Sequence, residues 1–83
     1  MGYLDESFAY KWARKWVEGS ILSYVNEKIT LNMVIGRIKR VIKSYGISKE
    51  EILAIISEAQ KSCHSIPNGE HKLQLLKGIV EKL

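Results

Sequence analysis

The chain has 83 residues, a formal net charge of +4 and a single cysteine. This length suffices for one domain with a modest core, and a lone cysteine excludes an intrachain disulfide, as is typical of proteins in a reducing compartment. The longest uninterrupted apolar run, Ile52 to Ile56, is far shorter than the ~18 residues of a membrane span. Because the opening MGYLDESF lacks the basic flank of a signal peptide, we expect a cytoplasmic protein without a membrane partner.

The first segment with helical periodicity is expected over residues 5–26, with Asp5 as a possible cap. A helix with a very wide apolar arc usually contacts two neighbours, or one neighbour and another chain. We therefore expect this helix to be the central element, with Trp12 and Trp16 buried. Its apolar residues cover more than half of its circumference: Phe8, Ala9, Trp12, Ala13, Trp16, Val17, Ile21 and Tyr24.

The second helix is expected over residues 31–45, where Thr30 can cap its start and Gly46 its end. Its apolar residues fill an arc of about 120°; they are Leu31, Val34, Ile35, Ile38, Val41, Ile42 and Tyr45.

The face opposite this apolar arc holds the most informative feature of the sequence, a group of four cations without an acid. They are Arg37, Lys39, Arg40 and Lys43. The 68 residues outside segment 31–45 carry nine positive and nine negative charges. The whole excess charge therefore lies in one segment, where it creates a local positive field. We expect these cations to point away from the core and to indicate an anionic partner.

The third helix is expected over residues 49–64, where Ser48 and Glu51 form an S-x-x-E capping box. The segment around Gly46 also resembles a helix-turn-helix motif over about 20 residues. However, Ile42 occupies a position where that motif prefers a small residue, and the would-be recognition helix opens with Glu50 and Glu51. Acids would be repelled by a phosphate-lined groove, so an ordinary helix–loop–helix corner is expected.

The fourth helix is expected over residues 69–82, after the only proline and with Asn68 as its cap. Neither the third nor the fourth helix could bury its apolar stripe alone. Residues 1–83 are therefore expected to form a single all-α domain, a compact bundle of four helices.

Two groups of residues are candidates for ligand binding. The four cations of the second helix, together with Lys11, Arg14 and Lys15 of the first, could contact nucleic-acid phosphates or an acidic partner, or remain solvated. Aromatic side chains exposed beside these cations could stack on bases. The aromatic candidates are Trp12, Trp16, Tyr10, Tyr24 and Tyr45, although residues at such spacing are more often core.

Catalysis and metal binding have little support in the sequence. Cys63, His64 and His71 do not make a four-ligand zinc site, and Cys63 falls on the apolar stripe of its helix. Neither a glycine-rich phosphate loop nor a nucleophile elbow is present. The sequence therefore predicts a non-catalytic binding protein with no cofactor and no metal.

The composition, rich in Ile, Lys and Glu with few Asn and Gln, leans toward that of thermophiles, although an AT-rich genome would produce much of the same bias. In size, positive charge, helical content and this composition, the whole chain is similar to the small subunits associated with B-family DNA polymerases in thermophilic archaea. The resemblance implies an accessory subunit in DNA replication, with a larger protein partner and nucleic acid nearby.

Two alternatives remain. One is an adaptor or regulator of plasmid or viral origin, docking or dimerising through the first helix. The other is a bundle that opens on anionic lipid.

Overall fold

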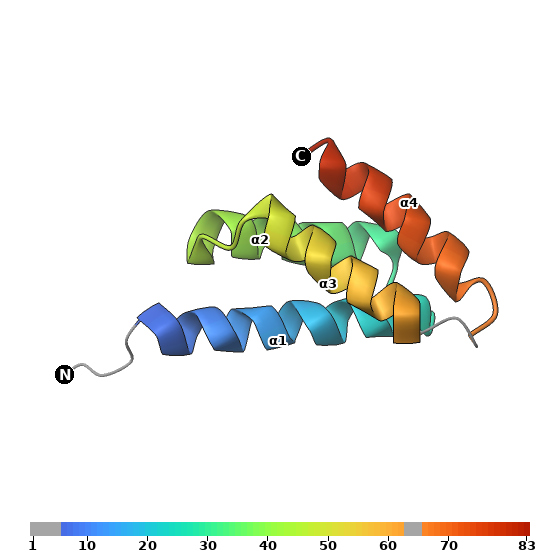
Figure 1. The fold of residues 1–83 in the computed structure, drawn as a ribbon, viewed down its shortest axis with the longest axis horizontal. Coiled ribbons are helices and arrows are strands. Elements are labelled where there is room, and N and C mark those ends of the chain that lie inside the picture. The colour runs from blue at the N-terminus through green and yellow to red at the C-terminus, as the bar shows by residue number, and fades with distance from the viewer. Residues whose placement is uncertain (1–5, 63–65) are drawn as a thin grey trace.

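The computed structural model describes residues 6–62 and 66–83, which form four α-helices (Figure 1). They are α1 (Glu6–Val25), α2 (Leu31–Tyr45), α3 (Lys49–Ser62) and α4 (Gly69–Glu81). No strand occurs in these two ranges, so the expected all-α bundle of four helices is confirmed. The bounds of α2 are those predicted, α1 ends one residue before the predicted Asn26 and α4 one residue before the predicted Lys82. The third helix starts at Lys49 as predicted, and its predicted last residues, 63 and 64, lie outside the described residues. Asp5 lies outside the described residues.

The bundle consists of two antiparallel helix pairs (Figure 1). The pairs are α1 with α2 and α3 with α4, which make the most extensive contacts. Smaller contacts join α1 to both α3 and α4, and α4 likewise contacts the other three helices, so α1 is not distinguished as the central element. By contrast, α2 and α3 make little direct contact although they are consecutive. The corner around Gly46 is therefore not a packed helix-turn-helix unit.

Local capping interactions explain where α2 begins and ends and where α3 begins. The Thr30 hydroxyl accepts a hydrogen bond from Met33 N at 3.2 Å and starts α2. Gly46 then ends α2 in the left-handed conformation, with φ 70°. The Ser48 hydroxyl accepts a hydrogen bond from Glu51 N at 3.1 Å and starts α3. Asn68 occupies the cap position of α4, but its side chain makes no capping hydrogen bond.

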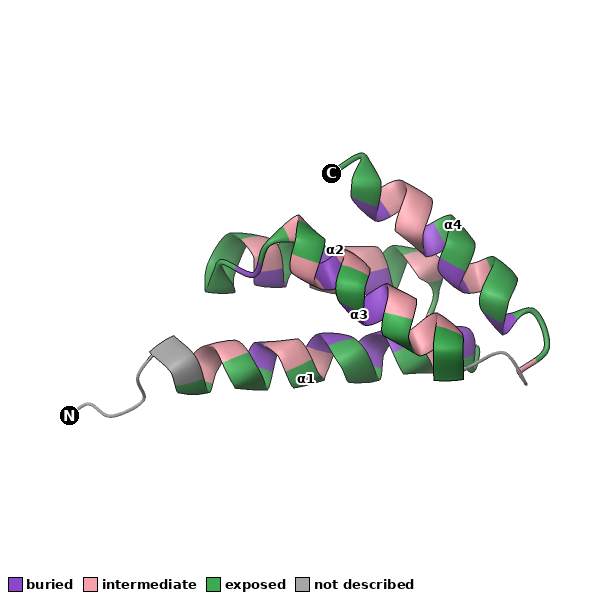
Figure 2. Cartoon of the chain, viewed as in Figure 1, coloured by how far each residue is buried: buried purple, intermediate pink, exposed green. Residues whose placement is uncertain are grey.

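The core lies where the helices face one another, as the purple segments of Figure 2 show. Each helix contributes a stripe at helical spacing, so burial follows the periodicity of the sequence. The exposed outer side of α1 faces away from the rest of the bundle (Figure 2). The buried apolar residues are Ala13, Val17, Ile21, Tyr24, Val25, Val34, Ile38, Val41, Ile47, Ile52, Ile55, Ile56, Leu73, Leu76 and Val80.

Polar contacts join the start of α4 to the end of α1. The Tyr24 hydroxyl donates to the Lys72 carbonyl at 3.2 Å, and Lys72 Nζ donates to the Tyr24 carbonyl at 3.4 Å. The same ammonium lies 5.4 Å from the centroid of the Tyr24 ring and 3.3 Å from a carboxylate oxygen of Glu27. These contacts give α4 a fixed position on α1.

Candidate functional site

Three of the four α2 cations lie where the sequence predicts them. Lys39, Arg40 and Lys43 are exposed on the side of α2 opposite the buried Val34 and Ile38. Within the described part of the chain, none of these three cations has a hydrogen-bond or ion-pair partner. Because α2 itself contains no acid, their charges are available to an external anion.

Arg37 does not point away from the core, so that expectation is wrong for this residue. Its Nη1 atom donates to the Ser20 hydroxyl at 3.1 Å, and its guanidinium lies 5.5 Å from the centroid of the Trp16 ring. Ser20 in turn donates to the Trp16 carbonyl at 2.8 Å. A planar, weakly hydrated guanidinium is well suited to stacking on an indole. Arg37 therefore packs between α2 and α1.

Three aromatic residues form a row along the junction of α1 and α2. The Trp12 and Trp16 rings are stacked, with centroids 6.0 Å apart and planes 14° from parallel. The Tyr45 ring also lies next to Trp12, with its centroid 6.1 Å from that of Trp12 and its plane tilted by 47°. We call Tyr45, Trp12 and Trp16, in this order, the aromatic row; Arg37 stands at its Trp16 end.

The aromatic row is substantially accessible to solvent, so the predicted burial of Trp12 is wrong. Trp12 is 52% exposed and Tyr45 is 39% exposed, whereas Trp16 is half-buried. The reason is that Ala13 and Val17 occupy the centre of the buried side of α1. The i, i+4 spacing then places Trp12 and Trp16 together on the flank of that stripe.

Tyr10 and Tyr24 do not join the aromatic row. Tyr24 is buried, and burial raises the pKa of its hydroxyl above the ordinary 10.0. Tyr10 is half-buried near α3. Desolvation, followed by its contact with the Glu51 carboxylate, raises the pKa of the Tyr10 hydroxyl. Both tyrosines therefore lie against the interior of the bundle.

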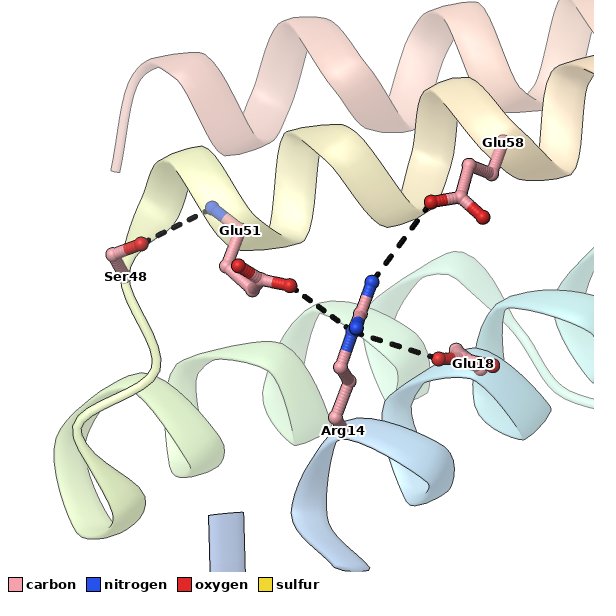
Figure 3. A network of polar contacts seen from close by, with 5 residues as sticks. All are labelled: Arg14, Glu18, Ser48, Glu51 and Glu58. Carbon is pink, nitrogen blue, oxygen red and sulfur yellow. Dashed lines mark hydrogen bonds and ion pairs between the residues drawn. The ribbon is translucent and has the colours of Figure 1, made fainter. Parts of the chain in front are cut away.

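The α1 cations separate into two groups with different surroundings. Lys11 and Lys15 are exposed, whereas Arg14 points toward α3 and three carboxylates (Figure 3). Its Nε atom lies 3.0 Å from Glu51 and 3.6 Å from Glu18, and Nη2 lies 3.9 Å from Glu58. The Nε–H direction misses Glu51, so this contact is an ion pair rather than a directed hydrogen bond. The guanidinium charge of Arg14 is thus compensated within the protein.

Glu51 contributes to the start of α3 differently from the predicted capping box. Its backbone N–H is held by Ser48, but its carboxylate points across to Arg14 rather than back to the Ser48 backbone (Figure 3). Only the Ser48 half of the box is formed, because a cation from α1 lies within reach.

A small depression of about 190 Å³ lies beside this ion-pair group, between α1 and α3. Of its charged lining residues, Arg14 already pairs with both Glu18 and Glu58. The other lining residues are Leu22, Ile55, Ala59 and Ser62. This combination has neither a free nucleophile–base pair nor an uncompensated cation for an anionic ligand.

Two of the three residues considered as metal ligands in the sequence are not described by the structure. Cys63 and His64 lie outside the described residues, and His71 is exposed on α4. Among the described residues, His, Cys, Asp and Glu form no group of three that could hold a metal ion. None of the described helices is long and apolar enough to cross a membrane.

Comparisons of the chain with protein-family models, with curated proteins and with solved structures found no match. The resemblance to the archaeal polymerase subunits therefore stays a prediction. The candidate site consists of the exposed cations of α2, Lys39, Arg40 and Lys43, and of the aromatic row at the junction of α1 and α2.

Proposed function

We propose that this chain is a non-catalytic binding module, an accessory subunit of a DNA-handling assembly, which contacts nucleic-acid phosphates through α2. The observation that carries the proposal is the exposure of Lys39, Arg40 and Lys43 on a helix without acids, none of them having a partner among the described residues. Cations of this kind displace the counterions condensed on a polyanion, and the released ions favour binding. The replication role and the archaeal, thermophilic source rest on the general resemblance alone.

The test is binding of labelled DNA, followed by fluorescence anisotropy as the salt concentration rises. We expect affinity to fall steeply between about 50 and 200 mM salt, without strong sequence preference. The double variant Lys39→Glu/Lys43→Glu should bind far more weakly and with a smaller salt slope.

The matched control is Lys28→Glu/Lys82→Glu, which makes the same change in net charge at two exposed lysines outside α2. Its DNA affinity should stay much closer to that of the wild-type protein. If both variants bind DNA equally weakly, the net charge of the protein rather than the α2 face determines DNA binding. Wild-type protein that binds no DNA or RNA at low salt would contradict the direct nucleic-acid proposal and leave an acidic protein as the partner of α2.

The second candidate is a protein adaptor or regulator that docks or dimerises through α1. It is favoured by the exposure of two large aromatic residues, Phe8 at 58% and Trp12 at 52%, in the N-terminal half of α1 (Figure 1). Sedimentation equilibrium would test the dimer. Self-association abolished by Trp12→Ser but unchanged by Lys39→Glu/Lys43→Glu would support this candidate, whereas a monomer at all concentrations would exclude the dimer.

A further inference from the structure

We infer that the polyanion bound at this site is single-stranded nucleic acid, whose bases stack on the aromatic row while its phosphates contact the neighbouring cations. This inference rests on the proposed function and specifies its ligand. It requires accessible aromatic rings, a rigid arrangement of those rings, and positive charge on the same side of the molecule. The described residues supply each of these.

The accessible rings are those of Trp12 and Tyr45. They come from different helices and meet near the start of α1 and the end of α2, with 6.1 Å between centroids. Burying large aromatic residues such as these in the core would contribute to the stability of a small helical protein, so their exposure has a cost. Base stacking on such rings is tolerant of sequence because every base has a π face.

The aromatic row is held in place from its buried end. Trp16 is stacked against Trp12, and the Arg37 guanidinium also lies over its ring. Arg37 is itself fixed by its hydrogen bond to Ser20, a buried residue of α1. Because the Trp16 ring is fixed by these contacts, Trp12 is positioned before any ligand arrives, which lowers the entropy cost of binding.

Cations border the aromatic row on both helices. Arg40 follows Arg37 by three residues, so it lies on the neighbouring part of the α2 surface and closer to Tyr45. On α1, Lys15 follows Trp12 by three residues and is likewise exposed. The nearby acid of α1, Glu18, is engaged by Arg14 on the α3 side. The surface therefore combines stacking groups with a positive field.

This combination favours a single strand over the other anionic partners. A duplex keeps its base faces stacked internally, about 3.4 Å apart along each strand, so it could use the cations but not the rings. An acidic protein segment would also use the cations, without a need for stacked indoles. A second copy of this chain would bring like charges together at the same surface. Only an unpaired strand uses both features.

The decisive experiment compares ligands of equal charge. The probes are a thymidine oligomer of about 16 nucleotides, an abasic oligomer of the same length, a duplex of half that length, which carries about the same charge, and poly-L-glutamate of matching charge. We expect the thymidine oligomer to bind tightest. The abasic oligomer should lose at least the stacking of one base, which corresponds to about 5-fold to 150-fold in affinity.

The matching variant is Trp12→Ala, with Leu75→Ala as control because Leu75 is a comparably exposed apolar residue on α4. Trp12→Ala should weaken binding of the thymidine oligomer by a similar factor. It should leave abasic binding and the salt slope unchanged, since it removes no charge. Leu75→Ala should bind both oligomers like the wild-type protein. Circular dichroism of each variant checks that the helices are retained.

The results separate the inference from the proposed function. Base stacking would be overturned if the wild-type protein bound the thymidine and abasic oligomers equally, or if Trp12→Ala bound the thymidine oligomer as tightly as the wild-type protein does. The proposed function would still stand in that case if Lys39→Glu/Lys43→Glu weakened binding. Preference for the duplex or for poly-L-glutamate would also overturn the inference, the latter indicating an acidic protein partner. Absence of binding to every nucleic-acid probe would overturn both.

Discussion

The guanidinium of Arg37 lies over the indole of Trp16, with 5.5 Å between Cζ and the ring centroid, while its Nη1 atom donates to Ser20. One residue of the basic segment thus joins α2 to α1. Arg40, three residues further along, has no such contact among the described residues. Two arginines on the same helix therefore have separate tasks, one in packing and one at the surface.

This difference predicts unequal effects on stability. Arg37→Ala should lower the free energy of unfolding by about 1–2 kcal/mol, because it removes a cation–π contact and a hydrogen bond. Arg40→Ala should change it by less than about 0.5 kcal/mol. Urea denaturation followed by circular dichroism measures both. Equal effects of the two substitutions would mean that the Arg37–Trp16 contact contributes little in solution.

The two tryptophans should also differ in solution. In the Trp16→Phe variant, the remaining Trp12 should emit at long wavelength and be quenched readily by acrylamide, since it is 52% exposed. Trp12→Ala should cost about 0.5–1.5 kcal/mol of stability, mainly the lost aromatic pairing. Trp16→Ala should cost more, because its half-buried ring also supports Arg37. A blue-shifted, protected Trp12 would show that this end of α1 is covered, for example by a second chain.

The start of α3 offers a test of the half-formed capping box. Ser48→Ala should lower stability by about 0.5–2 kcal/mol, because Glu51 N loses its capping acceptor. Glu51→Gln should have a smaller effect that decreases at high salt, since it removes a partly exposed ion pair with Arg14. In a double-mutant cycle, Glu51→Gln should couple with Arg14→Met and not with Ser48→Ala. Coupling to Ser48 instead would indicate that the reciprocal cap forms in solution.

Tyr24 gives a pH-dependent prediction. Tyr24→Phe should cost about 1 kcal/mol at neutral pH, where the hydroxyl donates to the Lys72 carbonyl. The folded state raises the pKa of Tyr24 above 10.0 by burial. As pH rises past 10, the unfolded chain therefore ionises first, and the stabilisation by Tyr24 declines. The difference in unfolding free energy between wild type and Tyr24→Phe should shrink in this range; a constant difference from neutral to alkaline pH would contradict the shift.

Sequence reasoning succeeded where structure is determined by neighbours along the chain. The helices were predictable because apolar periodicity and caps such as Thr30 and Ser48 act within a few residues. The exposure of Lys39 and Lys43 also follows from their position opposite the apolar arc of their own helix.

Sequence reasoning failed where the outcome depends on which helix lies alongside. Arg37 turned inward because Trp16 of α1 presents a ring beside it, and Glu51 turned away from Ser48 because Arg14 is near. Trp12 stayed accessible because Ala13 and Val17, rather than the tryptophans, face the neighbouring helices. The proximity of Tyr45 to Trp12 could not be read from periodicity, since it joins residues of two helices.

The division of the bundle into two helix pairs has a kinetic consequence. The most extensive contacts join helices that are consecutive in the chain, α1 with α2 and α3 with α4. Short chain separations between contacting residues lower the loop-closure entropy that must be lost before contacts form. Each helix pair can therefore form early and on its own. The later step of folding is then the association of two preformed helix pairs. The chain should accordingly fold within microseconds to milliseconds, as helical bundles of low contact order do.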